Sequence, residues 1–144
     1  YYSTQRGPVW LADTWSFAPE QNTWTKLCSP REGEPWPEGR FYHSATVSEM
    51  DDRLFLFGGT DGGNRHDPGG SFVFGPTAEL GDLWALNFDT TSWECLTQSP
   101  AVADPATLTS PCARCEHVTA AVRGQVWIYG GLHGDQTVSQ GTHP

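Results

Sequence analysis

The stretch Leu54-Phe-Leu-Phe-Gly58-Gly59 decides the fold, because its pattern of four apolar residues and two glycines returns as Val126-Trp-Ile-Tyr-Gly130-Gly131. Motifs on either side of it also return, in the same order: Arg40-x-x-His43 as Arg114-x-x-His117, Asp13-x-Trp15 as Asp82-x-Trp84, and Trp24-x-x-Leu27 as Trp93-x-x-Leu96. The offsets are close to one another (126 − 54 = 72, 114 − 40 = 74, 82 − 13 = 69 and 93 − 24 = 69). Internal repetition of this kind is typical of architectures built from stacked structural units.

The composition favours an all-β chain. Of the 144 residues, 37% are hydrophobic and 17% are charged, which lies within the soluble globular range. Seven Trp and seven Phe suit half-buried β-strands, while 16 Gly and 11 Pro supply frequent turns. Because no stretch shows apolar residues at a sustained helical spacing, we expect strands rather than helices.

The repeat resolves into two kinds of hairpin. The first joins strands at 42–48 and 53–57 and returns at 118–122 and 125–129. The second joins strands at 82–88 and 92–97 and has an earlier copy at 13–18 and 23–28. One complete unit is therefore expected to be four antiparallel strands.

These hairpins divide the chain into three segments. Residues 1–39 hold the outer half of a preceding unit and a connection, and residues 40–98 hold one complete unit with a Gly-rich insertion at 60–81. Residues 99–144 hold a second connection and the first two strands of a following unit.

The order of motifs, from Arg-x-x-His through the double glycine to Asp-x-Trp and Trp-x-x-Leu, resembles the kelch repeat. The resemblance covers nearly the whole chain apart from two long loops, and it implies four-stranded antiparallel blades of an incomplete β-propeller, one full blade plus two half blades. The repeats are near seventy residues rather than the usual fifty or so, and the excess lies at 60–81 and 99–113. The residues expected to hold the blades together are Arg40, His43, Gly58, Gly59, Trp84, Trp93, Arg114, His117, Gly130 and Gly131.

Two physical roles follow from the repeat. The paired glycines let the chain turn tightly and let neighbouring backbone approach, because glycine has no Cβ. Trp24 and Trp93 are expected to be buried between adjacent blades. One blade with two half blades leaves sheet faces uncovered. We therefore expect either further blades in a longer chain or another protein to cover them.

Charge and motifs exclude several classes of function. A net charge of −9 argues against a nucleic-acid surface, which needs clustered Lys and Arg. No apolar run is long enough to span a membrane. The absence of an Asn-x-Ser/Thr sequon leans toward a cytoplasmic rather than a secreted protein.

No metal, cofactor or catalytic site is expected. Cys112-x-x-Cys115 followed by His117 has the ligands of half a zinc site, but no second half is present. The state of Cys28, Cys95, Cys112 and Cys115, as thiols or a disulfide, stays open. The Gly-rich insertion lacks the Gly-Lys-Ser/Thr of a phosphate loop and is expected to be flexible.

The sequence favours a non-enzymatic scaffold for protein–protein interaction, within a multisubunit assembly or as a substrate-recruiting module. Its long loops are the expected contact surface. Phe72-Val73-Phe74 either folds back on the blade or docks on a partner, and the candidate partner-binding residues are Arg65, His66, Phe72 and Phe74. Two alternatives stay open: a kelch-type enzyme, a metal-dependent oxidase or specifier protein, with catalytic residues in other blades, and a carbohydrate-binding module, for which Trp36 is the tryptophan that the repeat does not explain.

Overall fold

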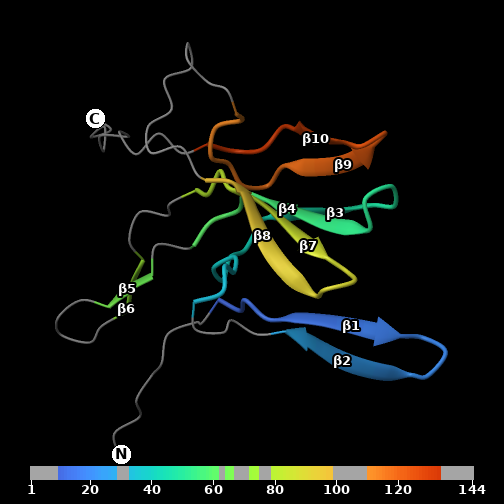
Figure 1. Cartoon of the computed structure of the whole chain (residues 1–144). Coiled ribbons are helices and arrows are strands. Elements are labelled where there is room, and N and C mark those ends of the chain that lie inside the picture. Colours follow the sequence, from blue (N-terminus) through green and yellow to red (C-terminus); the bar gives the residue numbers. More distant parts are fainter. Residues whose placement is uncertain are drawn as a thin grey trace, which may run out of the picture.

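The computed structural model describes residues 10–28, 33–61, 64–66, 72–74, 79–98 and 110–133, and these contain strands and no helix (Figure 1). The ten described strands are β1 (Thr14–Ala18), β2 (Thr23–Cys28), β3 (Ser44–Ser48), β4 (Arg53–Phe57), β5 (Asn64–His66), β6 (Phe72–Phe74), β7 (Leu83–Asn87), β8 (Ser92–Thr97), β9 (Val118–Val122) and β10 (Gln125–Tyr129).

The central element is a four-stranded antiparallel sheet in the order β3-β4-β7-β8. The hairpins β1–β2 and β9–β10 lie on opposite sides of this sheet (Figure 1). The expected fold class, one full blade plus two half blades, is therefore confirmed. The division of the chain at residues 39/40 and 98/99 stays a prediction.

The strand bounds agree closely with the sequence pattern. The strands expected at 23–28, 53–57, 92–97, 118–122 and 125–129 have those bounds. The strand expected from residue 42 begins at Ser44, because Tyr42 has a φ of 54° and cannot continue a strand. Asp82 also lies just outside its expected strand, and its carboxylate takes part in the ion pair described below.

Backbone irregularities repeat along with the sequence. Register shifts occur between Thr14 and Trp15 in one copy and between Leu83 and Trp84 in the other. Positive φ angles likewise recur at Asn22 and Thr91, 49° and 51°, and at Tyr42 and Glu116, 54° and 56°. The copies thus share bulges and turns as well as strands, so the two half blades repeat the geometry of the complete blade.

The hydrophobic core lies on one face of the four-stranded sheet and consists of Leu56, Trp84, Leu86 and Trp93. Residues from the preceding segment pack against it, since Leu27 and Trp36 contact this cluster. The indole rings of Trp36 and Trp93 meet edge to face, with centroids 6.3 Å apart. Trp36 therefore helps join the β1–β2 hairpin to the complete blade.

The expectation that Trp24 is buried was wrong. Trp93 is 5% exposed, whereas Trp24 is 64% exposed. Trp93 belongs to the core cluster with Leu56, Trp84 and Leu86, whereas Trp24 lies on a two-stranded hairpin, where its ring packs against that of Phe17 at 4.9 Å.

Adjacent blades meet along their first strands. The Thr46 hydroxyl on β3 accepts a hydrogen bond of 3.1 Å from the Ala121 N–H on β9. The Ser44 hydroxyl and His117 Nε2 lie 2.6 Å apart across the same joint. These bonds fix β9–β10 against the central sheet.

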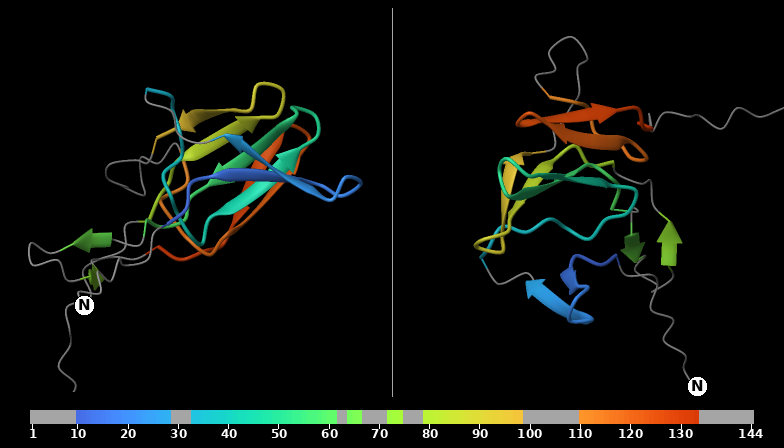
Figure 2. Two further views of the ribbon diagram at one scale, coloured as in Figure 1. Left: turned by 90° about the horizontal axis from the view of Figure 1, so that it is seen from below. Right: turned by 90° about the vertical axis from the view of Figure 1, so that its right-hand side faces the viewer.

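Part of the Gly-rich insertion forms strands that the sequence pattern did not predict. β5 and β6 pair as a short antiparallel hairpin, in which Arg65 pairs with Val73 and His66 with Phe72. The hairpin lies apart from the four-stranded sheet (Figures 1 and 2). The described part of the chain also holds no helix long and apolar enough to cross a membrane.

Candidate protein-binding surface

Five described segments gather at one end of the blades, which we call the double-glycine end (Figure 2): 33–43, 58–61, 79–82, 110–117 and 130–133. The opposite end, the turn end, carries the turns at 19–22, 49–52, 88–91 and 123–124. The β5–β6 hairpin projects from the double-glycine end (Figure 2). This end is the candidate surface.

Backbone hydrogen bonds make the double-glycine end a rigid platform. Phe41 and Thr60 exchange two bonds, of 3.1 and 2.9 Å. Gly59 donates to the Arg114 carbonyl at 2.9 Å and accepts from Leu80 at 2.8 Å, so one glycine links both blades. Loops held in this way can position side chains for recognition.

The glycine pair has the conformation that the repeat predicts. Gly58 and Gly59 have φ angles of 62° and 91°, which favour glycine. A Cβ on Gly58 would lie 2.6 Å from the Arg114 carbonyl oxygen, and one on Gly59 would lie 2.7 Å from that of Phe41. Gly131 repeats this close approach, 2.7 Å from the Cys115 carbonyl oxygen. Gly130 has a φ of 73° but nothing within 4 Å of its Cβ position.

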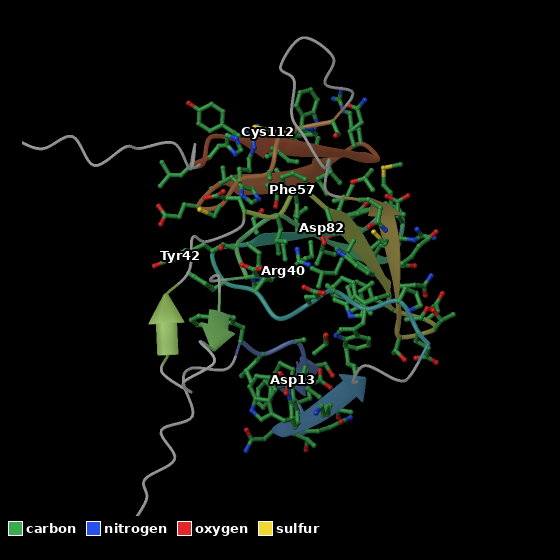
Figure 3. All side chains as sticks on the ribbon, turned by 90° about the vertical axis from the view of Figure 1, so that its left-hand side faces the viewer. Asp13, Arg40, Tyr42, Phe57, Asp82 and Cys112 are labelled. Atoms are coloured by element: carbon green, nitrogen blue, oxygen red, sulfur yellow. The ribbon has the colours of Figure 1, made fainter. Side chains whose placement is uncertain are left out.

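A buried ion pair holds the platform from inside. Arg40 makes a bidentate pair with Asp82, with N–O distances of 2.6 and 2.9 Å (Figure 3). Its guanidinium also donates to the carbonyl oxygens of Glu38 and Gly58, both at 3.1 Å. Burial opposes ionisation of Asp82, but hydrogen bonds from Arg40 and Trp84 outweigh it and lower the pKa of Asp82.

Arg114 repeats the arrangement of Arg40 in the following half blade. Its Nε donates to the Cys112 carbonyl at 3.1 Å, and its Nη1 donates to the Gly130 carbonyl at 3.0 Å. The position of the carboxylate is taken by a thiol, because Nη2 contacts Cys112 Sγ at 3.2 Å. Among the described residues, Arg114 forms no ion pair.

The repeated histidines differ in their surroundings, and their expected structural role stays a prediction. His117 is buried at the joint between blades, where it contacts the Ser44 hydroxyl and lies edge to face with Phe57 at 5.2 Å. Its pKa is lowered by burial and by the nearby Arg114 charge. His43 is more exposed, and burial together with Arg40 lowers its pKa as well.

The sequence did not single out an aromatic cluster at this end. The Phe41 ring lies 4.6 Å from that of Trp10 and 4.7 Å from that of Tyr42. Tyr42 is 56% exposed at the margin of the double-glycine end (Figure 3), and its carbonyl accepts a bond of 3.0 Å from the Glu116 N–H. A difference between the two copies could have pointed to this cluster, since Phe41-Tyr42 stands where the second copy has Cys115-Glu116.

The predicted partner-binding residues lie on the projecting hairpin. Arg65 and His66 are in β5, and Phe72 and Phe74 are in β6, with position 74 across from 64 and position 72 across from 66. The backbone therefore brings them together at the double-glycine end. Their role in binding stays a prediction, as does the role of residues 99–109, which lie outside the described residues.

The cysteines of the described region are free thiols, namely Cys95, Cys112 and Cys115. Burial and the charges of Glu79 and Glu116 raise the pKa of Cys115, which does not favour a reactive thiolate. Within the described ranges, no group of three or more His, Cys, Asp or Glu side chains could hold a metal ion. The side chain of Cys28 lies outside the described residues.

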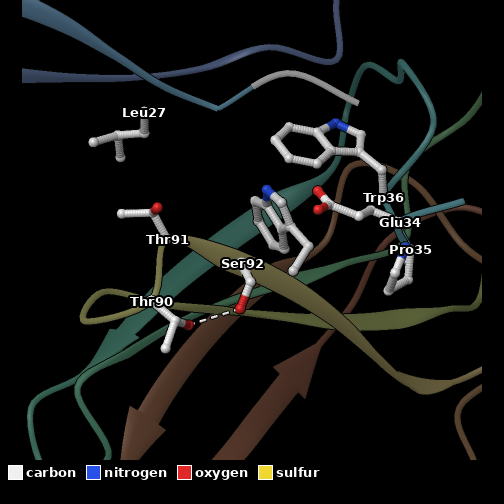
Figure 4. Close-up of a pocket in the computed structure, with 8 residues that line it drawn as sticks. Leu27, Glu34, Pro35, Trp36, Thr90, Thr91 and Ser92 are labelled. Atoms are coloured by element: carbon white, nitrogen blue, oxygen red, sulfur yellow. Dashed lines mark hydrogen bonds between the residues drawn. The ribbon is translucent and has the colours of Figure 1, made fainter. Parts of the chain in front are cut away.

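A cavity of about 390 Å³ lies between the β1–β2 segment and the outer strand β8 (Figure 4). Its lining residues are Leu27, Glu34, Pro35, Trp36, Thr90, Thr91, Ser92 and Trp93. The Trp36 indole N–H is already bonded to the Ala12 carbonyl at 2.6 Å, and Trp93 belongs to the core. Both indoles therefore serve the packing between blades.

The fold and its repeated contacts define a class: antiparallel four-stranded blades of an incomplete β-propeller. The chain matches the family described as the KLHDC2/KLHL20/DRC7 Kelch-repeats domain over residues 3–143, so it belongs to the kelch-repeat family. It is also similar to the host cell factor homolog hcf-1 of Caenorhabditis elegans, with 29% identity over 115 residues. That match covers 78% of this chain and 12% of the relative, so this chain spans only a small part of the relative's length. Kelch-repeat domains are typically protein–protein interaction modules.

Proposed function

We propose that this chain is a protein-interaction scaffold whose double-glycine end binds a protein partner, within a multisubunit assembly or as a module that recruits a substrate protein. The family membership supports the class of function. The partner itself would be recognised by the side chains that the platform presents.

The main support for the proposal is that the long connections lie at one end of the blades and the short turns at the other. The turn end closes with short turns, whereas the insertion at 60–81 leaves and re-enters the blade at the double-glycine end. The connection that follows β8 starts at this end too, because β8 runs from the turn at 88–91 toward it. Variable loops on a rigid scaffold are the usual sites of recognition.

The side chains at this end also suit a protein partner. Tyr42 is exposed and held by a strained backbone, and aromatic residues are enriched in protein interfaces. The net charge of −9 favours partners that carry a positively charged surface.

The test is a Phe72→Ala/Phe74→Ala double variant of the full chain, compared with Phe88→Ala at the turn end, where Phe88 is exposed. Bound proteins captured by each variant from the same extract are quantified by mass spectrometry. We expect specific partners to be lost from the double variant and kept by the control. The proposal also requires an unchanged melting temperature in the double variant, and the substitution of the exposed Phe88 should cost at most about 0.5 kcal/mol.

Two outcomes contradict the proposal. Unchanged capture by the double variant would show that the hairpin binds nothing. A lowered melting temperature would show instead that the two phenylalanines belong to the folded blade. Tyr42→Asn provides a second variant, since Asn tolerates the positive φ at this position while removing the ring.

The enzyme alternative is tested by metal analysis of the purified full chain. We expect neither copper nor iron at a stoichiometric level, since the proposal is a binding role. Stoichiometric copper or iron would favour the oxidase or specifier alternative. For a carbohydrate-binding role, the structure offers little support in Trp36, whose ring packs against Trp93 rather than standing open.

A further inference from the structure

The cavity beside β8 has no part in the proposed function. Its volume of about 390 Å³ lies within the range of small-molecule sites, which is about 300–1,000 Å³. Its walls come from the end of β2, the connection at 34–36, the turn at 88–91 and the start of β8 (Figure 4). None of its described lining residues lies on β1 or β10, so the cavity does not arise from the unpaired edges of the half blades.

Two tryptophan rings form adjoining walls of this cavity. The indoles of Trp36 and Trp93 meet at an angle of 70°, with centroids 6.3 Å apart, and both line the cavity. The Trp36 ring is held in place by its N–H bond to the Ala12 carbonyl, and Trp93 is anchored in the core. Because a cation is attracted to an aromatic face within about 6 Å of the ring centroid, a cation in the corner between the rings would interact with both.

A carboxylate supplies the charge that complements such a cation. Glu34 lies two residues before Trp36, and Figure 4 shows the two side chains directed into the same space. Among the described lining residues none is Lys or Arg, so the formal charge at the cavity is negative. Leu27 and Pro35 add apolar surface, which favours an alkylated cation over a strongly hydrated one.

The repeat does not account for the carboxylate or for one of the two rings. At the offset of 74 that relates the connections before Arg40 and Arg114, Glu34 corresponds to Leu108 and Trp36 to Ser110. A connection can therefore lead into this part of a blade without either group. The cavity combines Trp93, which the repeat shares, with two side chains that belong to this joint between blades.

We propose that this cavity binds a trimethylammonium group, with the cation in the corner between the two indoles and Glu34 beside it. A quaternary ammonium has no N–H donors that need partners, and its methyl groups carry the charge to the aromatic faces. The proposal goes beyond the proposed function, because it concerns a cavity beside β8 rather than the projecting hairpin. Each can fail without the other.

The test is a titration of the full chain with the N-acetyl amide of trimethyllysine, followed in two-dimensional ¹H–¹⁵N NMR spectra. We expect the indole N–H signals of Trp36 and Trp93 and the amide signal of Thr91 to move together and to give one Kd. The analogue in which a carbon atom replaces the quaternary nitrogen has the same shape without the charge. It should bind about 5- to 30-fold more weakly, because it lacks the cation–π attraction.

A second titration distinguishes two sources of the same group. Choline carries the trimethylammonium group without the lysine stem. Tighter binding of trimethyllysine would favour a methylated protein side chain as the ligand, and tighter binding of choline would favour a free small molecule. Either result supports a site for a trimethylammonium group.

The charge variant is Glu34→Gln, which alters an exposed side chain and should weaken binding of trimethyllysine about 2- to 5-fold. Glu20→Gln is the matched control, since it makes the same change at an exposed position in the turn at 19–22, away from the cavity. Trp36→Phe keeps an aromatic ring but weakens the cation–π attraction, so it should reduce the affinity for trimethyllysine more than the affinity for the neutral analogue.

Three outcomes overturn the proposal. The first is that none of the three signals moves at about 10 mM trimethyllysine, which would mean a Kd well above the millimolar range. The second is equal affinity for trimethyllysine and its neutral analogue, which would show an apolar cavity only. The third is the same loss of affinity in Glu34→Gln and Glu20→Gln. If Trp36→Phe lowers the melting temperature, the comparison of the two glutamate variants decides.

Discussion

Arg40 and Asp82 form the most buried of the ion pairs described, with side chains 3% and 13% exposed. The arginine satisfies two carbonyl oxygens as well as the carboxylate, so its guanidinium connects the strand before the double glycine with the strand after the insertion. We therefore expect its role to be structural, namely to hold the platform on which the candidate surface is built.

The Arg40→Ala substitution should lower the free energy of unfolding by about 3–5 kcal/mol, because it leaves the Asp82 carboxylate buried without its partner. Arg53→Ala is the control: it removes an exposed pair with Glu94 at 3.3 Å and should cost at most about 1 kcal/mol. Urea denaturation measures both. Equal losses in the two variants would contradict the structural role of Arg40.

His117 makes the stability of the chain depend on pH. Its pKa in the folded chain is lowered below the ordinary value of about 6.5, so the unfolded chain binds more protons near this pH. The stabilising contribution of neutral His117 is therefore present above about pH 6.5 and is lost as the pH falls toward the folded-state pKa. Arg114 and His43 are the charged and titratable groups that act on it.

We expect the melting temperature to fall between about pH 7.5 and pH 5.5 in the wild type, and to fall less in His117→Gln, which removes the titrating group. Ser44→Ala removes the contact with Nε2 but keeps the imidazole, so its pH dependence should persist. Differential scanning calorimetry at several pH values provides the measurement. An identical pH dependence in wild type and His117→Gln would contradict this explanation.

At the scale of the elements, the double glycine after β4 determines how closely neighbouring segments approach. Gly59 and Gly124 both have positive φ angles, of 91° and 71°, but only Gly59 lies against neighbouring backbone. Comparing substitutions at Gly59 and Gly124 therefore separates the energetic effect of a positive φ from the effect of close packing.

Gly124→Ala should cost about 1–2 kcal/mol, the penalty of a left-handed conformation for a residue with a Cβ. Gly59→Ala should cost clearly more, since its Cβ would lie 2.7 Å from the Phe41 carbonyl oxygen and the backbone would have to shift. Urea denaturation of both variants gives the comparison. If the two variants lose the same free energy of unfolding, Gly59 is required only for its positive φ angle and not for the close approach of the backbone.

The sequence pattern was sufficient to predict the strands of the blades but not β5 and β6, because apolar alternation and turn residues are local signals and the Gly-rich insertion shows neither clearly. It also singled out Arg40, Gly58, Gly59 and Trp93, since each recurs in another copy, and their role in holding the blade stays a prediction. The pattern could not show which copy of a repeated residue is covered: Trp24 and Trp93 share a motif, but only Trp93 has a complete blade around it.

The contacts between blades were likewise beyond the sequence pattern. Ser44 and His117 lie far apart in the chain, and only the packing of β3 against β9 brings their side chains to 2.6 Å. Tyr42 escaped attention because the repeat marks what the copies share, whereas the exposed ring lies where they differ. Residues that recur therefore predicted the fold, and residues that differ between copies are candidates for recognition.

For the whole molecule, the decisive feature is that β3, β4, β7 and β8 form one sheet, although the insertion at 60–81 separates β4 from β7 in the sequence. The register of this ladder runs from Arg53 across from Asn87 to Phe57 across from Leu83. The core of Leu56, Trp84, Leu86 and Trp93 draws on β4, β7 and β8. Stability should therefore be shared across the insertion rather than divided between two hairpins.

Native-state amide hydrogen exchange, measured residue by residue on the full chain, tests this directly. We expect the ladder amides of β4 and β7 to exchange with the same free energy of opening and the same dependence on denaturant, as one cooperative unit. Independent opening of β3–β4 and β7–β8, with different free energies, would contradict a single blade across the insertion.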